Sequence, residues 1–299
     1  MAAEDPVTRA TRLIHGLEKK SLDVVSLGQP HSRAHAADMA KVVSKLSPVM
    51  GNLLEFEFAT YLNEQGEWPE GTYWCRQDPD FPDLALLLKK DNAERKKYLQ
   101  GIEVKCWFPF ATEMTGRFRE SQRRLLKANV NVMVVAWLPE FIVHGKPKIL
   151  ATWSDKAIDI AKCRDAHYHD PPRYLVVEPE DTGARTRNLQ QTNCAGYVLQ
   201  FNDRPDLLKK ARKEVAAWPR GERYSISPKY QARIRQLMAR YKYRMDTNFS
   251  KIDRIDHKPL EKFKKSVLAT KLHGKTVAEW AQLVADMDER AFEAMMKLN

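Results

Sequence analysis

The chain has 299 residues, and its 50 Lys and Arg against 39 Asp and Glu give a formal net charge of +11. This length allows a full hydrophobic core, arranged as one domain with an appendage or as two domains. No apolar run approaches the roughly 20 residues that span a membrane, and residues 1–16 lack the apolar segment of an export signal, so we expect a cytoplasmic protein without membrane contact.

The first 66 residues predict three helices. The first begins at Asp5-Pro6, because proline suits the first helical position, and ends before Gly28. The second covers residues 32–46. The third covers residues 47–66, with Ser47 as its N-cap and Gly66 at its end.

The third helix carries both an apolar stripe and a candidate acid. Its stripe consists of Leu54, Phe58, Tyr61 and Leu62. Glu55 lies beside this stripe and could reach inward, whereas Glu57 is rotated further toward solvent.

Three strands follow, near residues 72–76, 81–90 and 99–107. The linker between the last two is polar and contains Asp91-Asn92, which favours a β-hairpin. A helix is predicted over residues 115–129. The apolar, β-branched run 130–138 predicts a fully buried strand.

Later segments are less regular. The four cysteines form no CxxC pair, so we expect reduced thiols. Cys163, His167 and His169 resemble metal ligands, but no fourth ligand follows at a recognisable spacing, and we interpret this cluster as a polar surface loop. Further strands are predicted at 147–154, 173–180 and 196–203, and further helices at 206–218, 228–245, 259–272 and 276–298.

The positive charge is concentrated in the last third of the chain. Residues 205–299 contain 22 Lys and Arg against 12 Asp and Glu, whereas residues 1–204 contain 28 and 27. This excess indicates a surface that binds a polyanion, with nucleic acid as the first candidate. The final segment, 276–298, is interpreted either as a DNA clamp or as a dimerisation surface. Its expected core residues are Trp280, Leu283, Val284 and Phe292.

The stretch GIEVKCW, residues 101–107, places an acid and an amine on one face of a strand. Glu103 and Lys105 point the same way, because alternate residues of a strand share a face. A hairpin centred near Ala93 places Asp83 opposite Glu103. The two carboxylates repel each other unless a proton or a cation lies between them. A simple cross-strand ion pair is one interpretation, and a Mg²⁺ ion held by both acids and a nearby backbone carbonyl is the other.

FPD at residues 81–83 followed by EVK at 103–105 resembles the PD-(D/E)xK nuclease superfamily, and within it the type II restriction endonucleases. The resemblance covers residues 47–138 and implies an α/β fold with a restriction-endonuclease-like αβββαβ core, a mixed central sheet flanked by helices. We therefore expect an N-terminal helical segment over 1–46 and a catalytic core with DNA-reading insertions over 47–204. A basic helical region for DNA binding or dimerisation is expected over 205–299.

Carried over by position, the resemblance implies that Asp83 and Glu103 bind Mg²⁺ with the carbonyl of Val104. Lys105 would hold or activate the attacking water, and Glu55 would be the acid of the family's helix, with Glu57 competing for that role. The implied reaction is hydrolysis of a phosphodiester to 5′-phosphate and 3′-hydroxyl ends.

Two polar segments are candidates for reading DNA, because Arg suits guanine and Asn or Gln suit adenine. We expect residues 115–124 to contact phosphates more than bases, and residues 182–193 to read bases. The candidate residues are Arg117, Arg119, Gln122, Arg185, Arg187, Asn188, Gln190, Gln191 and Asn193.

The sequence thus predicts a Mg²⁺-dependent, sequence-specific endonuclease for double-stranded DNA, a restriction enzyme that acts as a homodimer on a palindromic site. A nuclease of the same superfamily that recognises DNA structure or damage in repair or recombination is the first alternative. A basic DNA-binding protein without catalysis is the second.

Overall fold

The structure is a computed structural model whose described residues fall into two compact units. The first contains Met1–Gly116, Glu120–Ala161 and His257–Asn299, and the second contains Arg117–Arg119 and Lys162–Asp256. The described residues are 4–77, 81–88, 100–111, 114, 116–118, 120, 122–169, 174–177, 194–199, 206, 209–210, 213–214, 217, 229, 232, 236, 240, 243–245, 251–255 and 257–298.

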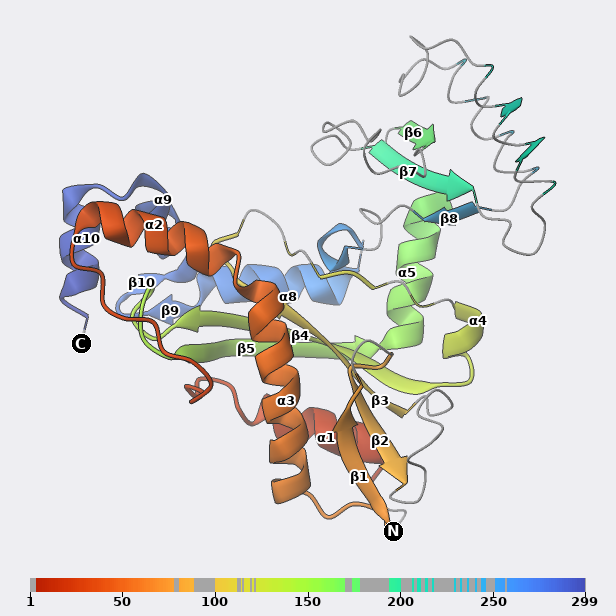
Figure 1. The fold of residues 1–299 in the computed structure, drawn as a ribbon, viewed down its shortest axis with the longest axis horizontal. Helices are drawn as coiled ribbons and strands as arrows, with labels where there is room; N and C mark the ends of the chain where they lie inside the picture. The colour runs from red at the N-terminus through yellow and green to blue at the C-terminus, as the bar shows by residue number, and fades with distance from the viewer. Residues whose placement is uncertain are drawn as a thin grey trace. The chain divides into compact units, whose positions relative to one another are not determined.

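The first unit is built on a five-stranded sheet with the strand order β1-β2-β3-β4-β5. β3 and β4 are parallel, whereas the other neighbours are antiparallel. The expectation of an α/β fold with a mixed sheet flanked by helices is therefore confirmed. The strands are β1 (Thr72–Arg76), β2 (Leu84–Leu88), β3 (Gln100–Trp107), β4 (Asn129–Pro139) and β5 (Pro147–Lys156) (Figure 1).

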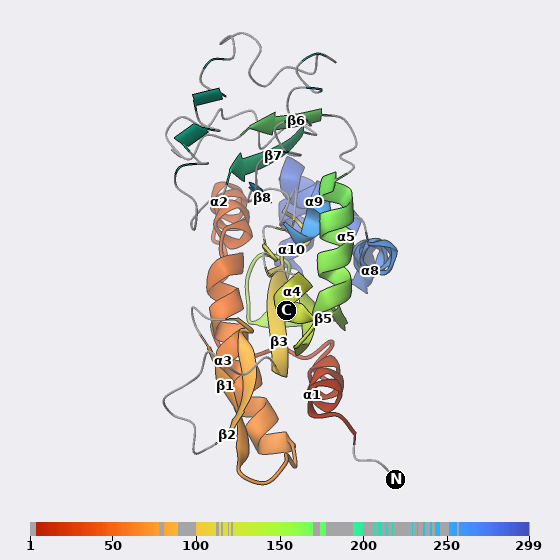
Figure 2. The ribbon, with the colours of Figure 1, turned by 90° about the vertical axis from the view of Figure 1, so that its right-hand side faces the viewer.

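Helices cover both faces of this sheet. On one face, α3 (Ser47–Gln65) places Gly51 against Cys106 of β3, and α1 (Pro6–His15) places the ring of His15 3.0 Å from the hydroxyl of Ser154 on β5. On the other face lies α8 (Lys258–Ala269), whose Phe263 ring is 6.2 Å from that of Trp107. Figure 2 shows α3 and α8 on opposite sides of the sheet.

The helix boundaries at the N-terminus differ from those expected. α1 ends at His15 and not before Gly28, because the following residues pair with the β5 region: Lys19 donates to the Ile149 carbonyl at 2.7 Å and Leu22 to the Pro147 carbonyl at 2.8 Å. These bonds cover part of an exposed strand edge. α2 (Arg33–Ser44) follows, capped by Ser32.

The stripe of α3 packs largely as predicted, since Leu54, Phe58 and Leu62 are buried. The N-cap of α3 is Leu46 and not Ser47, which is the first residue of the helix, while Gly66 is its C-cap as expected.

β4 is buried along most of its length. From Val132 to Leu138 its side chains are at most 1% exposed. Both of its edges are paired, and helices lie on both faces of the sheet. The predicted buried strand over 130–138 is therefore confirmed.

The helix predicted over residues 115–129 is wrong for most of the described residues in that range, because among them only α4 (Gln122–Leu125) is helical. Within the second unit, Arg117 forms a β-bridge with Lys251, and the Phe118 carbonyl accepts a hydrogen bond from Arg164 at 2.9 Å. These long-range bonds use backbone groups that a helix would have paired locally.

The second unit also contains two departures from the sequence prediction. Residues 163–169, expected as a surface loop, belong to the helix α5 (Ala157–His169). The end of the helix expected over 228–245 forms the strand β8 (Tyr243–Met245). β8 joins β6 (Tyr174–Val177) and β7 (Cys194–Leu199) in a three-stranded sheet, and a 3₁₀ turn, η5 (Ile252–Arg254), follows.

The last 43 residues, from His257 to Asn299, pack in the first unit, so the division by contacts differs from the range 205–299 expected from charge. After α8 come the two short strands β9 (Lys271–Leu272) and β10 (Lys275–Thr276). Among the helices in the described part of the chain, none is both long enough and apolar enough to cross a membrane.

The single helix expected over 276–298 is two helices, α9 (Val277–Asp286) and α10 (Glu289–Met296). The break lies at Met287, whose φ of 38° is left-handed, and Asp288 caps the second helix. Trp280 and Val284 are buried as predicted, whereas Leu283 and Phe292 are only partly buried.

Candidate functional site

The two acids predicted to face each other do so. Leu84 of β2 pairs with Ile102 of β3, so Asp83, which directly precedes β2, lies opposite Glu103. The Asp83 backbone N–H donates to Glu103 Oε2 at 3.3 Å. The predicted hairpin register is therefore confirmed for these two strands.

A glycine allows this close approach. A Cβ placed on Gly101 would lie 2.0 Å from the Leu84 carbonyl oxygen and 2.7 Å from Cγ of Pro82. Any larger residue at 101 would therefore push the start of β2 away from β3. Gly101 thus contributes to the position of Asp83.

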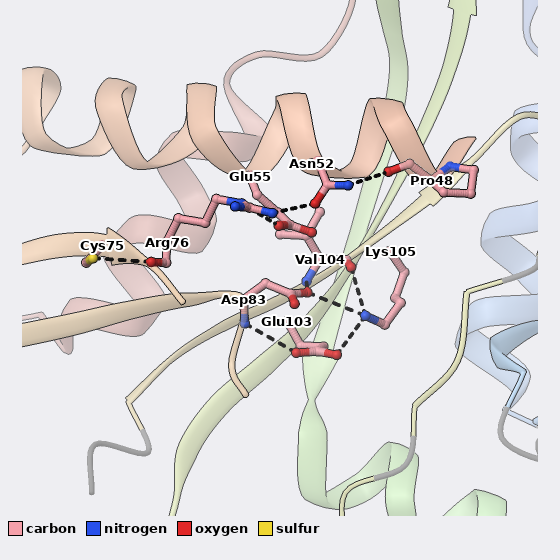
Figure 3. A network of polar contacts seen from close by, with 9 residues as sticks. All are labelled: Pro48, Asn52, Glu55, Cys75, Arg76, Asp83, Glu103, Val104 and Lys105. Atoms are coloured by element: carbon pink, nitrogen blue, oxygen red, sulfur yellow. Dashed lines mark hydrogen bonds and ion pairs between the residues drawn. The ribbon is translucent and has the colours of Figure 1, made fainter. Parts of the chain in front are cut away.

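Three oxygen atoms converge on the ammonium of Lys105 (Figure 3). Nζ donates to Glu103 Oε1 at 2.6 Å, to the Val104 carbonyl at 3.0 Å and to Asp83 Oδ2 at 3.4 Å. The same Asp83 oxygen accepts from the Val104 N–H at 2.8 Å. We call Asp83, Glu103, Val104 and Lys105 the carboxylate–lysine cluster.

The charges of this cluster are held in a largely buried environment. The side chains of Glu103 and Lys105 are 10% and 12% exposed, and that of Asp83 is 22% exposed. Burial opposes the charged form of Lys105, but the charges of Glu103 and Asp83 outweigh it and raise the pKa of Lys105. Burial also raises the pKa of Glu103, against the opposing charge of Lys105. The ammonium therefore stays charged at neutral pH.

Glu55 reaches the same region from α3. Its Oε2 accepts a hydrogen bond from Arg76 Nε at 3.0 Å, and the guanidinium also donates to Asn52. Burial, followed by the negative charge of Asp83, raises the pKa of Glu55 to about 7, although Arg76 opposes the shift. Of the two candidate acids, Glu55 and Glu57, Glu55 is the one in the polar network of Figure 3.

Arg76 is a member of this network that the sequence reasoning missed. It ends β1 and lies on the same face of that strand as Trp74, whose backbone N–H and carbonyl bond the side chain of Asn63 on α3. A basic residue two positions after a buried Trp, on the face toward an acidic helix, was the available signal.

The donor set suits a hard divalent cation. Mg²⁺ prefers oxygen ligands, and in proteins it is commonly bound by one or two carboxylates with several water molecules retained. In the carboxylate–lysine cluster two carboxylates and a carbonyl already point to one cationic centre, the Lys105 ammonium. Among the described residues, no group of three or more His, Cys, Asp or Glu is arranged to hold a metal, so water would complete the coordination.

Most of the predicted DNA-reading residues lie outside the described part of the chain. Arg117 is exposed and belongs to the second unit, and Gln122 begins α4 in the first. Their predicted contacts stay predictions. The candidates outside the described residues are Arg119, Arg185, Arg187, Asn188, Gln190, Gln191 and Asn193.

Comparisons of the chain with protein-family models, with curated proteins and with solved structures gave no match. The site must therefore be judged by its own geometry.

Proposed function

We propose that the chain is a Mg²⁺-dependent endonuclease that hydrolyses double-stranded DNA at specific sequences, of the restriction type and with a PD-(D/E)xK core. The observation that carries this proposal is the convergence of Asp83, Glu103 and the Val104 carbonyl on one cationic centre beside Lys105. The element order α3, β1, β2, β3, α4, β4 supports it, since it follows the αβββαβ order of that superfamily.

Asp83 Oδ2, Glu103 Oε1 and the Val104 carbonyl would hold the Mg²⁺ ion. The bound ion would supply positive charge that polarises a phosphoryl oxygen and lowers the pKa of a water molecule. Because three oxygens now surround the Lys105 ammonium, it would have to move to admit the ion.

Lys105 would then act on the phosphodiester. The neighbouring carboxylates keep the ammonium protonated, so it would stabilise the negative charge that develops on the phosphate. It would also orient the attacking water for in-line displacement, which leaves a 5′-phosphate and a 3′-hydroxyl.

Glu55 and Arg76 would act beside the reacting atoms. With its pKa raised to about 7, Glu55 is poised to exchange a proton near neutral pH. Arg76 would fix the orientation of this carboxyl group through its 3.0 Å hydrogen bond.

The basic residues of the last third would bind the DNA backbone, and a homodimer would deliver one cut to each strand of a palindromic site. The predicted DNA-reading residues keep their proposed role.

The direct test is digestion of double-stranded DNA of known sequence with the purified chain and Mg²⁺, followed by mapping of the ends. Discrete fragments with 5′-phosphates are expected, and EDTA should abolish them. Cleavage at branched or damaged DNA alone would favour the repair alternative. Unchanged cleavage in EDTA would contradict the metal mechanism.

Lys105→Ala separates catalysis from a structural ion cluster. We expect cleavage to be lost while DNA binding, measured in Ca²⁺, is retained. Lys127→Ala, at an exposed position near the end of α4, is the matched control and should cleave normally. If the wild type folds and binds DNA but cleaves it under no condition, the alternative of a DNA-binding protein without catalysis would be favoured.

A further inference from the structure

Gln77 extends the row of acids across a third strand. The β1–β2 pairing ends formally at Arg76 opposite Leu84, but the Gln77 N–H donates to the Asp83 carbonyl at 2.8 Å, so the register continues by one residue. Gln77, Asp83 and Glu103 thus lie side by side on three neighbouring strands. Directly opposed residues of antiparallel strands share a face, so the three side chains start from the same face of the sheet.

The side-chain amide of Gln77 is buried without a partner. The residue is 2% exposed, and within the described part of the chain neither Oε1 nor Nε2 has a hydrogen-bond partner. Burying an amide in this state is unfavourable, and such a group in a folded protein calls for a missing water, ion or ligand.

Among the described residues, each of the other buried side chains with an unpaired polar atom has only one such atom, an indole N–H or one ring nitrogen. These are Trp74, Trp137, His144 and His257. Gln77 differs because both ends of its amide are unsatisfied and because its strand position is next to a predicted metal ligand.

We infer that Gln77 completes the cation site, its Oε1 serving as a further oxygen donor to the ion that Asp83 and Glu103 hold. This inference rests on the proposed function. Side-chain amide oxygens are ordinary ligands of hard cations. A neutral donor at this position also adds a ligand without adding a third negative charge to two carboxylates that already repel each other.

The competing explanation is that Gln77 is a poorly satisfied core residue with no ligand. Both explanations predict that Gln77→Met, which replaces the amide by an apolar group of similar length, keeps or raises the melting temperature of the metal-free protein. They differ on metal binding. Only a ligand role predicts that the same variant weakens the binding of Ca²⁺ and Mg²⁺.

The experiment measures the Kd of Ca²⁺ and of Mg²⁺ by titration calorimetry, together with the shift in melting temperature that each metal produces. For Gln77→Met we expect a Kd at least about tenfold higher and a smaller shift than in the wild type, the size seen when support of a metal site is removed. Gln77→Glu, which retains an oxygen donor and adds charge, should bind at least as tightly as the wild type. Gln100→Met, at an exposed position that begins β3, is the matched control and should bind like the wild type.

Metal affinity of Gln77→Met equal to that of the wild type would overturn the inference while leaving the proposed function intact. A wild type that binds neither metal would overturn both. Should Gln77→Met not fold, Gln77→Asn serves in its place, because it keeps the amide but withdraws it by one methylene. It is expected to weaken binding, and unchanged binding by this variant would equally count against the ligand role.

Discussion

Two strand pairs of the same sheet, β4–β5 and β2–β3, differ in the length of their pairing and in the side chains beside it. β4 and β5 pair from Asn131 opposite Lys156 to Pro139 opposite Pro147, and β4 is buried along nearly its whole length. In the described residues, β2 and β3 pair only at Leu84 with Ile102 and at Ala85 with Gly101, next to the carboxylate–lysine cluster.

The difference shows where this sheet can place charged groups. The ladder with β5 satisfies the backbone of β4, and the apolar side chains of β4 from Val132 to Leu138 fill both faces, so this strand contributes mainly to folding. Where the ladder of β2 and β3 ends, the Val104 N–H bonds the Asp83 carboxylate and the Val104 carbonyl bonds Lys105. Changes in β4–β5 should therefore act on stability, and changes beside β2–β3 should act on activity.

The largest expected effect is on stability, from Leu138→Ala. This β4 side chain is fully buried, so its loss should lower the free energy of unfolding by about 2–5 kcal/mol. Urea denaturation followed by circular dichroism measures the change. Val42→Ala, at a position 56% exposed, is the control and should change it by less than about 0.5 kcal/mol. Equal effects of the two variants on the free energy of unfolding would contradict the stabilising role assigned to β4–β5.

Asp83→Asn should lower cleavage more than it lowers stability. Replacing this carboxylate removes one of the acids that would hold the cation, and we expect cleavage to fall by about 10²–10³-fold, as when one electrostatic group of an active site is removed. The midpoint of urea unfolding should change less than in Leu138→Ala. Cleavage rates under single-turnover conditions test the first expectation, and full activity in Asp83→Asn would contradict the assignment of this residue.

Gly101→Ala should affect both properties. The added methyl group would overlap the Leu84 carbonyl, so β2 must move and carry Asp83 with it. We expect a loss of about 1–3 kcal/mol in stability together with reduced cleavage. Gly28→Ala is the control, because a Cβ at position 28 meets nothing within 4 Å. Identical behaviour of the two variants would show that the strand spacing does not position Asp83.

The smallest expected effect is a change in pH dependence from Glu55→Gln. Burial raises the pKa of Glu55 from 4.5 to about 7, so the folded state binds a proton that the unfolded state has released. The stability from this group is present below pH 4.5 and is lost as the pH rises through about 7. Between these values wild-type stability should therefore fall relative to that of Glu55→Gln, as measured by urea denaturation across the range.

The control for that variant is Glu57→Gln, which lies about 200° around the helix from Glu55. It should keep the pH dependence of the wild type. A parallel pH dependence in the wild type and Glu55→Gln would show that Glu55 does not exchange its proton in this range.

The sequence predicted the elements that depend on local patterns. β1 matched its predicted range, and β4 was recognisable because a β-branched apolar run has few alternatives to a buried strand. The position of Asp83 opposite Glu103 followed from the arithmetic of a hairpin, in which one pairing determines the rest.

Features set by distant contacts could not be predicted in this way. The helical pattern of residues 115–129 was overridden by backbone bonds from Arg117 and Phe118 to residues over 40 positions away. The Arg76–Glu55 pair joins β1 to α3, and the burial of Gln77 is a property of the folded chain, so neither has a sequence pattern of its own.

The hydrogen bonds of Lys105 have a consequence for the order of folding and metal binding. Because the Lys105 ammonium already lies between the two acids, the chain would not need the proposed Mg²⁺ to complete its fold, unlike small domains that fold only around their ion. Loading would then be an exchange of one positive charge for another. Chelators should accordingly abolish the proposed cleavage without unfolding the protein. Added Mg²⁺ should then restore cleavage without a refolding delay.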